Sequence, residues 1–215
     1  MILVLDLDDT LYEEQSFVLS GFRHVAEWLS KQTSISEKLL LDSLVKELAD
    51  NGRGKVFDEI LKDLKIFSSE NLSECIRIYR GHTPVITLFP GANKVLERYS
   101  TMPLYLVTDG DPSVQNSKID ALNIRNRFKK IYTTGSLGEE WKKPSLKAFS
   151  EIAKIEDVTM SELVYVGDDP NKDFVQLNSI GAQTIRVMTG RFRDLRMPPH
   201  FEAQRQITSI ADLQI

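Results

Sequence analysis

Five short apolar runs constrain the fold of this chain more than any other feature. They cover residues 2–7 (ILVLDL), 103–108 (PLYLVT), 130–133 (KIYT), 163–167 (LVYVG) and 183–187 (QTIRV). Most are continuously apolar rather than alternating, which is typical of strands that helices cover on both faces of a parallel sheet. Helical patterns lie between the later runs, at 91–100, 113–122 and 145–155. This alternation predicts an α/β fold with a doubly wound parallel sheet, a Rossmann-like core.

The connection between the first two predicted strands is too long for a compact α/β core, since it holds about 95 residues. Four apolar stripes within it have the i, i+3, i+4 spacing of helices. They comprise Phe22, Val25 and Leu29; Leu41, Leu44, Val45 and Leu48; Phe57, Ile60, Leu61 and Leu64; and Leu72, Cys75, Ile76 and Tyr79. We therefore predict a Rossmann-like core of residues 1–13 and 85–215 and a small helical cap domain of residues 14–84. A lid over a binding site is the favoured role of this insert, and additional helical mass is the alternative.

Composition and charge narrow the classes of partner. The net charge of −4 provides no broad basic field for nucleic acid or for an anionic membrane. No segment reaches the roughly 18 uninterrupted apolar residues of a membrane helix, and the N-terminus lacks the pattern of a signal peptide. The single cysteine, Cys75, excludes an internal disulfide. These features predict a soluble cytoplasmic protein with no nucleic-acid or membrane partner, and they carry no signal for the oligomeric state.

Polar side chains gather where the predicted strands end. At the end of the first run are Asp6, Asp8 and Thr10, and at the end of the second are Thr108, Asp109, Gly110 and Asp111. After the third come Trp141, Lys142, Lys143 and Pro144, and after the fourth come Asp168, Asp169, Pro170, Asn171, Lys172 and Asp173. Ligands of open α/β sheets bind outside the carboxyl ends of the strands, so we expect these groups to lie together. Clustered carboxylates repel one another unless some are protonated or a cation joins them. Such oxygen ligands suit Mg²⁺, and a lysine and a hydroxyl beside the cation would complete a phosphate site.

Each of these polar residues taken alone has a simpler explanation. Asp8, Asp111, Ser145 and Asp169 could each cap a helix or stabilise a turn. Four strand ends that carry such groups in sheet order favour one shared site over four separate caps.

Four segments, DLDDTLY, LYLVTDG, KKPSLKAF and VGDDPNKDF, resemble the four motifs of the haloacid dehalogenase-like hydrolase superfamily and occur in that family's order. The resemblance covers the whole chain, including a helical cap inserted after the first motif. The first motif is highly specific and the fourth moderately so, whereas the second and third are weak when taken alone. The resemblance implies a phosphatase-type member of this superfamily.

The resemblance also implies roles for individual residues of the first two motifs. Asp6 matches the nucleophile that forms an aspartyl-phosphate, and Asp8 matches the general acid and base. Thr108 matches the hydroxyl that binds phosphate, and we assign the adjacent Asp109 to the same phosphate site. Asp6 and Asp8 are expected to bind the metal as well, Asp8 through its backbone carbonyl.

The last two motifs imply the remaining roles. Lys143 matches the motif lysine because it precedes Pro144, although Lys142 is adjacent. Asp168 matches the metal ligand, and Asp173 matches the second acid of the fourth motif. Asp169 lies in the same turn and is an additional acid and candidate metal ligand.

Physical chemistry agrees with these roles. A carboxylate is a weak nucleophile toward phosphate because like charges repel, and Mg²⁺ and Lys143 would offset that repulsion. Asp8, two positions after Asp6, could protonate the leaving oxygen and later deprotonate water, provided that the chain leaves regular strand geometry there. The predicted function is Mg²⁺-dependent hydrolysis of a small phosphomonoester such as a sugar phosphate, a nucleotide or phosphoglycolate.

Three alternative functions remain open. A phosphomutase or phosphotransferase would use the same scaffold and the same acids. A regulatory or binding protein would not require both Asp6 and Asp8. A dehalogenase is the least favoured alternative, because the dehalogenases of the superfamily lack an acid at the position that Asp8 matches.

The sequence offers two further candidate regions. The loop 51–55 places Arg53 and Lys55 among glycines, where they could select the substrate, since the cap usually sets substrate choice in this superfamily; a plain turn with solvated charges is the alternative. The segment 188–215 contains Arg191, Arg193, Arg196 and Arg205 and is interpreted as a solvated tail rather than a basic strip. Asp9 receives no role beyond that of a turn residue.

Overall fold

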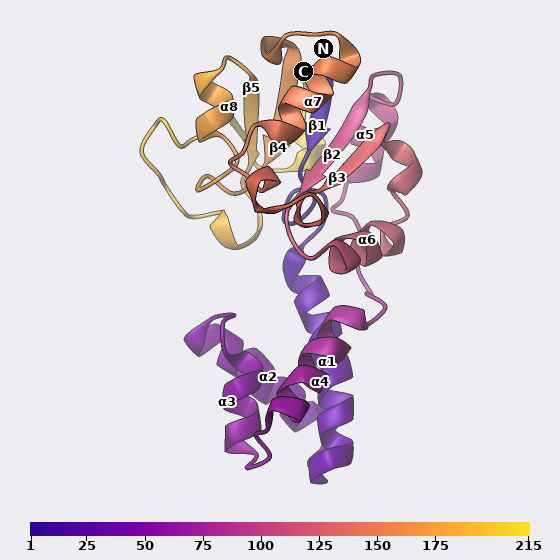
Figure 1. The fold of residues 1–215 in the computed structure, drawn as a ribbon, viewed down its shortest axis with the longest axis vertical. Coiled ribbons are helices and arrows are strands. Elements are labelled where there is room, and N and C mark those ends of the chain that lie inside the picture. The colour runs from indigo at the N-terminus through magenta and orange to yellow at the C-terminus, as the bar shows by residue number, and fades with distance from the viewer. The chain divides into compact units, whose positions relative to one another are not determined.

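The computed structural model describes all residues from 1 to 215 (Figure 1). The chain divides into two compact units, which we call the core unit (Met1–Glu14 and Ile86–Ile215) and the helical unit (Gln15–Val85). None of the helices combines the length and the apolar character needed to cross a lipid bilayer.

The core unit is built on one six-stranded sheet in the order β3-β2-β1-β4-β5-β6. The strands are β1 (Ile2–Leu5), β2 (Leu104–Thr108), β3 (Lys130–Thr133), β4 (Leu163–Gly167), β5 (Gln183–Val187) and β6 (Arg205–Ile207). All neighbouring strands pair in parallel. The predicted α/β fold class with a doubly wound parallel sheet is confirmed.

The position of β1 in the sheet determines where a ligand site can form. Leu5, at its carboxyl end, aligns with Leu106 of β2 on one side and with Val166 of β4 on the other. The strand order reverses between β1 and β4, and such a switch point leaves a crevice outside the carboxyl ends of the strands. The groups that follow β1, β2 and β4 are therefore brought to one edge of the sheet.

Helices flank this sheet and bury its strands. They are α5 (Ala92–Arg98), α6 (Pro112–Ala121), α7 (Lys147–Glu156) and α8 (Val175–Ser179). Every residue of β1, β2 and β4 is buried, as expected for continuously apolar strands. Phe149 of α7 packs edge-to-face on Tyr165 of β4, with ring centroids 5.1 Å apart.

Two features of the core unit differ from the predictions. β1 ends at Leu5 rather than at residue 7, so Asp6 already lies outside the regular strand. The segment 188–215 is not a simple solvated tail, because it contributes β6 at the edge of the sheet. In addition, the fully buried Arg186 of β5 forms an ion pair with Glu202, with Nη1 and Oε2 2.8 Å apart.

The helical unit consists of α1 (Glu14–Thr33), α2 (Glu37–Asn51), α3 (Val56–Asp63) and α4 (Ser69–Gly81). Each matches one of the four predicted apolar stripes, although Leu64 of the third stripe follows the last residue of α3. Ser36 and Ser68 cap α2 and α4 by accepting hydrogen bonds from backbone N–H groups three residues later. The unit has a core of its own, in which Leu29, Leu44, Leu61 and Cys75 are completely buried.

The chain leaves and re-enters the core unit along paired backbone segments. Tyr12 and Leu88 form an antiparallel bridge, and the N–H of Phe89 donates to the carbonyl of Leu11 at 2.8 Å. The two ends of the insertion are thus fastened together within the core unit itself.

Candidate active site

A buried lysine lies between two buried carboxylates at the end of β1. The Nζ atom of Lys143 is 2.9 Å from Asp6 and 2.8 Å from Asp173. It also donates to the hydroxyl of Tyr165 at 2.8 Å, and that hydroxyl donates to Asp173 at 3.1 Å. Although burial lowers the pKa of Lys143, the charges of Asp173 and Asp6 outweigh that effect and hold the pKa well above its usual value. This lysine is therefore a permanent cation beside Asp6.

A third carboxylate, that of Asp168, joins this cluster from the end of β4. Oxygens of Asp6, Asp168 and Asp173 lie within 4.8 Å of one another, and all three residues are buried. Burial, with help from neighbouring carboxylates, raises the pKa of Asp6 to about 7 and that of Asp168 to about 10. Three acids and one lysine leave a deficit of positive charge. A hard divalent cation with oxygen ligands, such as Mg²⁺, fits both the donor set and that deficit.

Asp8 lies apart from this carboxylate cluster and is held by three donors. Its carboxylate accepts hydrogen bonds from Lys118 at 2.7 Å, Gln115 at 2.8 Å and Tyr12 at 2.5 Å. Burial raises the pKa of Asp8, but Lys118 and the other donors outweigh it and hold the pKa below its usual value. The side chain is therefore ionised at neutral pH, as a general base requires.

Gln115 and Lys118 were missed by the sequence reasoning. Both are buried on α6, and Gln115 also donates to the hydroxyl of Thr108 at 2.5 Å. They lie three residues apart and precede the buried Ile119 and Leu122. Two polar residues on the apolar face of a predicted helix are the signal that could have identified them.

Asp109 is engaged by its own set of partners. Its carboxylate accepts from the hydroxyl of Thr134 at 2.7 Å and from the backbone N–H of Lys143 at 3.2 Å, and it pairs with Lys172 at 3.2 Å. Burial raises its pKa, but Lys143 and Lys172 outweigh that effect, so the pKa lies below its usual value. Since an ionised side chain repels phosphate, only the backbone N–H of Asp109 could serve the predicted phosphate-binding role.

Several other predicted residues lie outside the carboxylate cluster. Asp111 caps α6 by accepting from the N–H of Ser113 at 2.9 Å, and Asp169 accepts from the N–H of Asn171 at 3.0 Å. Asp111 thus acts as a helix cap and Asp169 accepts a hydrogen bond within a turn, as the simpler explanation for each acid predicts. Lys142 pairs with the exposed Glu139, whereas its neighbour Lys143 is buried in the cluster.

A cavity of about 200 Å³, which we call the acidic pocket, opens at this edge of the core unit. Its walls include the predicted residues Asp6, Asp8, Thr108, Asp109, Asp168 and Asp169. They also include Lys172, which the sequence analysis placed among the polar groups at the strand ends. Asp9, Arg191 and Phe192 line the pocket as well, although no part in the site was predicted for them. Carboxylates, a hydroxyl and two cations line the pocket, and such a polar wall suits a charged ligand.

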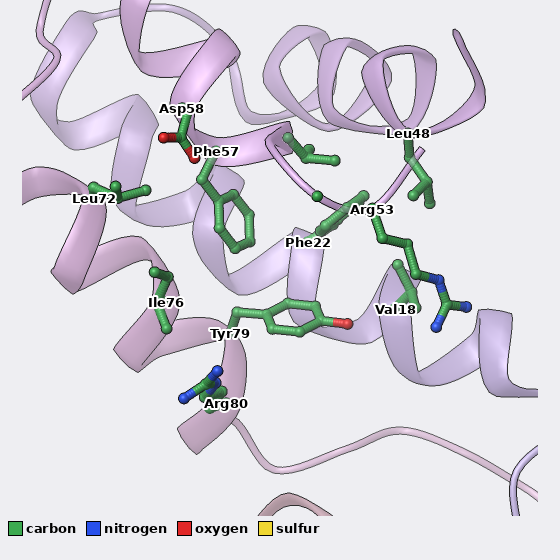
Figure 2. A pocket seen from close by; sticks show the side chains of 12 residues that line it. Val18, Phe22, Leu48, Arg53, Phe57, Asp58, Leu72, Ile76, Tyr79 and Arg80 are labelled. Carbon is green, nitrogen blue, oxygen red and sulfur yellow. The ribbon is translucent and has the colours of Figure 1, made fainter. Parts of the chain in front are cut away.

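The helical unit contains a cavity of its own, of about 310 Å³ (Figure 2). Aromatic and aliphatic side chains form most of its wall, and Figure 2 shows Phe22, Phe57 and Tyr79 around it. Arg53, from the loop before α3, and Arg80 of α4 add guanidinium groups. Of the two predicted cap residues, Arg53 thus lines this cavity and Lys55 does not.

The sequence is similar to known proteins over nearly its whole length. A family model described as haloacid dehalogenase-like hydrolase matches residues 3–187. A Methanocaldococcus jannaschii protein named glyceraldehyde 3-phosphate phosphatase is 29% identical over 204 residues, which cover 90% of this chain and 87% of that protein. A Methanopyrus kandleri protein of the same name is 28% identical over 217 residues and covers 94% of this chain and 92% of its own.

Solved structures are similar in fold. A HAD phosphatase from Thermococcus onnurineus has a TM-score of 0.60 at 20% identity, and the match covers 97% of this chain and 94% of that one. The magnesium-bound HAD-hydrolase YfnB from Bacillus subtilis has a TM-score of 0.66 at 16% identity, with coverage of 97% and 94%. At these identities, the likeness is one of fold.

Proposed function

The chain belongs to the haloacid dehalogenase-like hydrolase family, and from this premise we propose that it is a phosphatase that hydrolyses a small phosphomonoester with Mg²⁺. The observation that carries the proposal is the buried Asp6, which lies 2.9 Å from Lys143 at the end of β1. A charged lysine beside a carboxylate lowers the repulsion that a phosphate dianion would meet there.

In the proposed reaction, an oxygen of Asp6 attacks the phosphorus atom in line with the leaving oxygen. The bond from phosphorus to the leaving oxygen breaks, Asp8 gives that oxygen a proton, and an aspartyl-phosphate forms on Asp6. Asp8 then takes a proton from water, the water oxygen attacks phosphorus, and the Asp6 carboxylate is released with inorganic phosphate. One covalent intermediate thereby divides the transfer into two steps.

The proton transfers depend on how Asp8 is held. Lys118, Gln115 and Tyr12 fix its carboxylate and favour the ionised form. The dianionic substrate adds negative charge nearby and raises the pKa of Asp8 again, so that Asp8 takes up a proton from solvent and can give it to the leaving group. Gln115 couples this acid to Thr108, the proposed phosphate-binding hydroxyl.

The metal would be held by the carboxylates of Asp6 and Asp168 and by the backbone carbonyl of Asp8. When bound, Mg²⁺ supplies positive charge that offsets the charge of the transferring phosphoryl group. Asp173 is tied to Lys143 and Tyr165, and it also accepts from the N–H of Asp169 at 3.0 Å. We assign it the task of holding Lys143 rather than that of a ligand.

The substrate proposed for first testing is glyceraldehyde 3-phosphate, because the relatives that cover most of this chain carry that name. We further propose that the helical unit acts as a cap and that Arg53 and Lys55 take part in selecting the substrate. The cavity that Arg53 lines supports a selective role for Arg53.

The test is release of phosphate from a panel of phosphorylated metabolites in the presence of Mg²⁺. Asp6→Asn removes the nucleophile and is expected to lower kcat by at least about 1,000-fold. Asp111→Asn, which changes the acid that caps α6, serves as the control and keeps activity. Appreciable turnover by Asp6→Asn would overturn the mechanism, and movement of phosphate between positions without release would indicate a phosphomutase instead.

A further inference from the structure

Asp9 is buried in the core unit although it has no part in the proposed chemistry. Its backbone adopts the left-handed conformation, with a φ of 52°. Its carboxylate accepts from the N–H of Glu14 at 2.8 Å and from the N–H of Arg191 at 3.3 Å, and its carbonyl accepts from the hydroxyl of Thr189. One acid thereby fastens the segment after β1 to the loop after β5.

Gly190 allows this close approach. Its φ is 61°, and a Cβ atom at this position would overlap the carboxylate of Asp9. Any other residue would therefore face both an unfavourable backbone conformation and a clash. The segment from Thr189 to Arg191 is held against Asp9 by contacts that depend on this glycine.

Arg191 differs from Lys172, the other cation that lines the acidic pocket. Lys172 is bound to Asp109. Two buried lysines outside the pocket wall are also paired, Lys118 with Asp8 and Lys143 with Asp6 and Asp173. The side chain of Arg191 forms no ion pair, and its guanidinium carbon lies 4.5 Å from the centroid of the Phe192 ring. It is thus the cation of this pocket whose charge no carboxylate of the protein neutralises.

We propose that Arg191 is a specificity residue that binds a carboxylate on the leaving group of the substrate, and that Asp9 and Gly190 position it. This inference rests on the proposed phosphatase function and deepens it by naming the substrate class: phosphomonoesters that carry a carboxylate, which should be preferred over the uncharged aldehyde of glyceraldehyde 3-phosphate. A guanidinium binds a carboxylate through two parallel hydrogen bonds, and its stacking on Phe192 limits the orientations that it samples. Asp9 acts through Arg191 and is a positioning residue.

The experiment compares two substrates that differ only at the end remote from phosphate. D-3-Phosphoglycerate carries a carboxylate where D-glyceraldehyde 3-phosphate carries an aldehyde. Arg191→Ala is expected to lower the ratio of kcat/KM for the first over the second by about 10–100-fold, the range for loss of a charged hydrogen bond. Arg191→Lys recovers part of this ratio. Arg193→Ala, which removes an exposed arginine outside the acidic pocket, leaves the ratio unchanged.

Asp9→Gly tests the positioning role, because glycine tolerates the backbone conformation but has no carboxylate. The ratio is expected to fall toward that of Arg191→Ala, and the double variant is expected to show no further loss. Equal losses of activity toward both substrates in Arg191→Ala would overturn the specificity role. A normal ratio in Asp9→Gly would overturn the positioning role.

Two measurements separate this inference from the proposed function. Hydrolysis of p-nitrophenyl phosphate, which has no carboxylate, tests the phosphatase activity by itself. Calorimetric titration of D-3-phosphoglycerate into the Asp6→Asn variant tests Arg191 without turnover, and adding Arg191→Ala is expected to weaken binding at least about 10-fold. Unchanged binding would overturn the inference even if the enzyme proves to be a phosphatase.

Discussion

Asp6, Asp168 and Asp173 share a single lysine in the core unit, and this shortage of positive charge makes stability depend on pH. The pKa of Asp168 is about 10 in the folded protein, against roughly 3.9 in an unfolded chain. Between these values the folded state binds the extra proton, so the free energy of unfolding falls as pH rises. Asp6 has a pKa of about 7, so it also makes the free energy of unfolding fall as pH rises, between about pH 4 and 7.

Asp168→Asn is therefore expected to flatten the pH dependence of the metal-free protein. Each proton contributes at most about 1.4 kcal/mol per pH unit, so between pH 5 and 8 the variant loses less stability than the natural sequence does. Urea denaturation in the presence of a chelator measures this difference. Asp111→Asn is the control, because asparagine also caps helices well and this acid lies outside the cluster.

The same variant also tests the proposed metal site. Mg²⁺ is expected to raise the melting temperature of the natural sequence, because a ligand that binds only the folded state stabilises it. Asp168→Asn is expected to lose that increase, while Asp111→Asn keeps it. An increase of equal size in Asp168→Asn would mean that the cation binds elsewhere.

At the scale of elements, the loop after β5 depends on Gly190, and Gly181 provides a matched comparison. Both glycines have positive φ, but a Cβ at Gly181 meets nothing within 4 Å. Gly181→Ala should therefore cost about 1 kcal/mol, from the backbone conformation alone. Gly190→Ala adds the overlap with Asp9 and should cost about 1–3 kcal/mol more. Equal losses in urea denaturation would show that the loop does not depend on this contact.

The strands and helices that could be predicted are those marked by an apolar pattern within a short stretch of sequence. Short, mostly apolar runs predicted β1 to β5, and the charged residues at their ends predicted the carboxyl edge of the sheet as the site. β6 was missed because Arg205, Gln206 and Ile207 contain no apolar run, and the strand lies at the edge of the sheet. A strand that pairs on one side only and is largely exposed, as β6 is, needs no apolar run and so leaves no such pattern in the sequence.

The contacts of Asp9 were unpredictable for a different reason. The residue looks like a turn acid in DLDDTLY, and its hydroxyl partner, Thr189, lies 180 positions later. No pattern within a window of sequence joins two such positions. Gln115 and Lys118 are an intermediate case, because helical periodicity marks them as buried but does not show that they face Asp8.

At the scale of the whole molecule, the long connection after β1 was enough to predict a helical insertion. Its four apolar stripes became four helices around a separate core. Apolar periodicity reports which residues are buried, but it does not report which ligand a unit selects. The cap function and the roles of Arg53 and Lys55 therefore stay predictions.

The helical unit is expected to fold as a fragment of residues 15–85. Its buried side chains pack on one another, and the N–H of Val85 donates to the hydroxyl of Ser20 at 3.0 Å, which holds its last residue to α1. Circular dichroism of the fragment should show a cooperative thermal transition, although stability is modest at this size. Leu61→Ala in the fragment should cost about 2–5 kcal/mol. A featureless, non-cooperative melt would show that the unit requires the rest of the chain.

The fastening of Leu11 to Phe89 and of Tyr12 to Leu88 has a consequence for how this chain can change over time. Because the core unit itself holds both ends of the insertion together, the length of the intervening segment adds only slowly to the entropy of loop closure. Helices can be lengthened, exchanged or replaced by another module without moving the strands that carry Asp6 and Lys143. The junction is therefore a position at which a different insertion could change substrate selectivity while the catalytic residues stay in place.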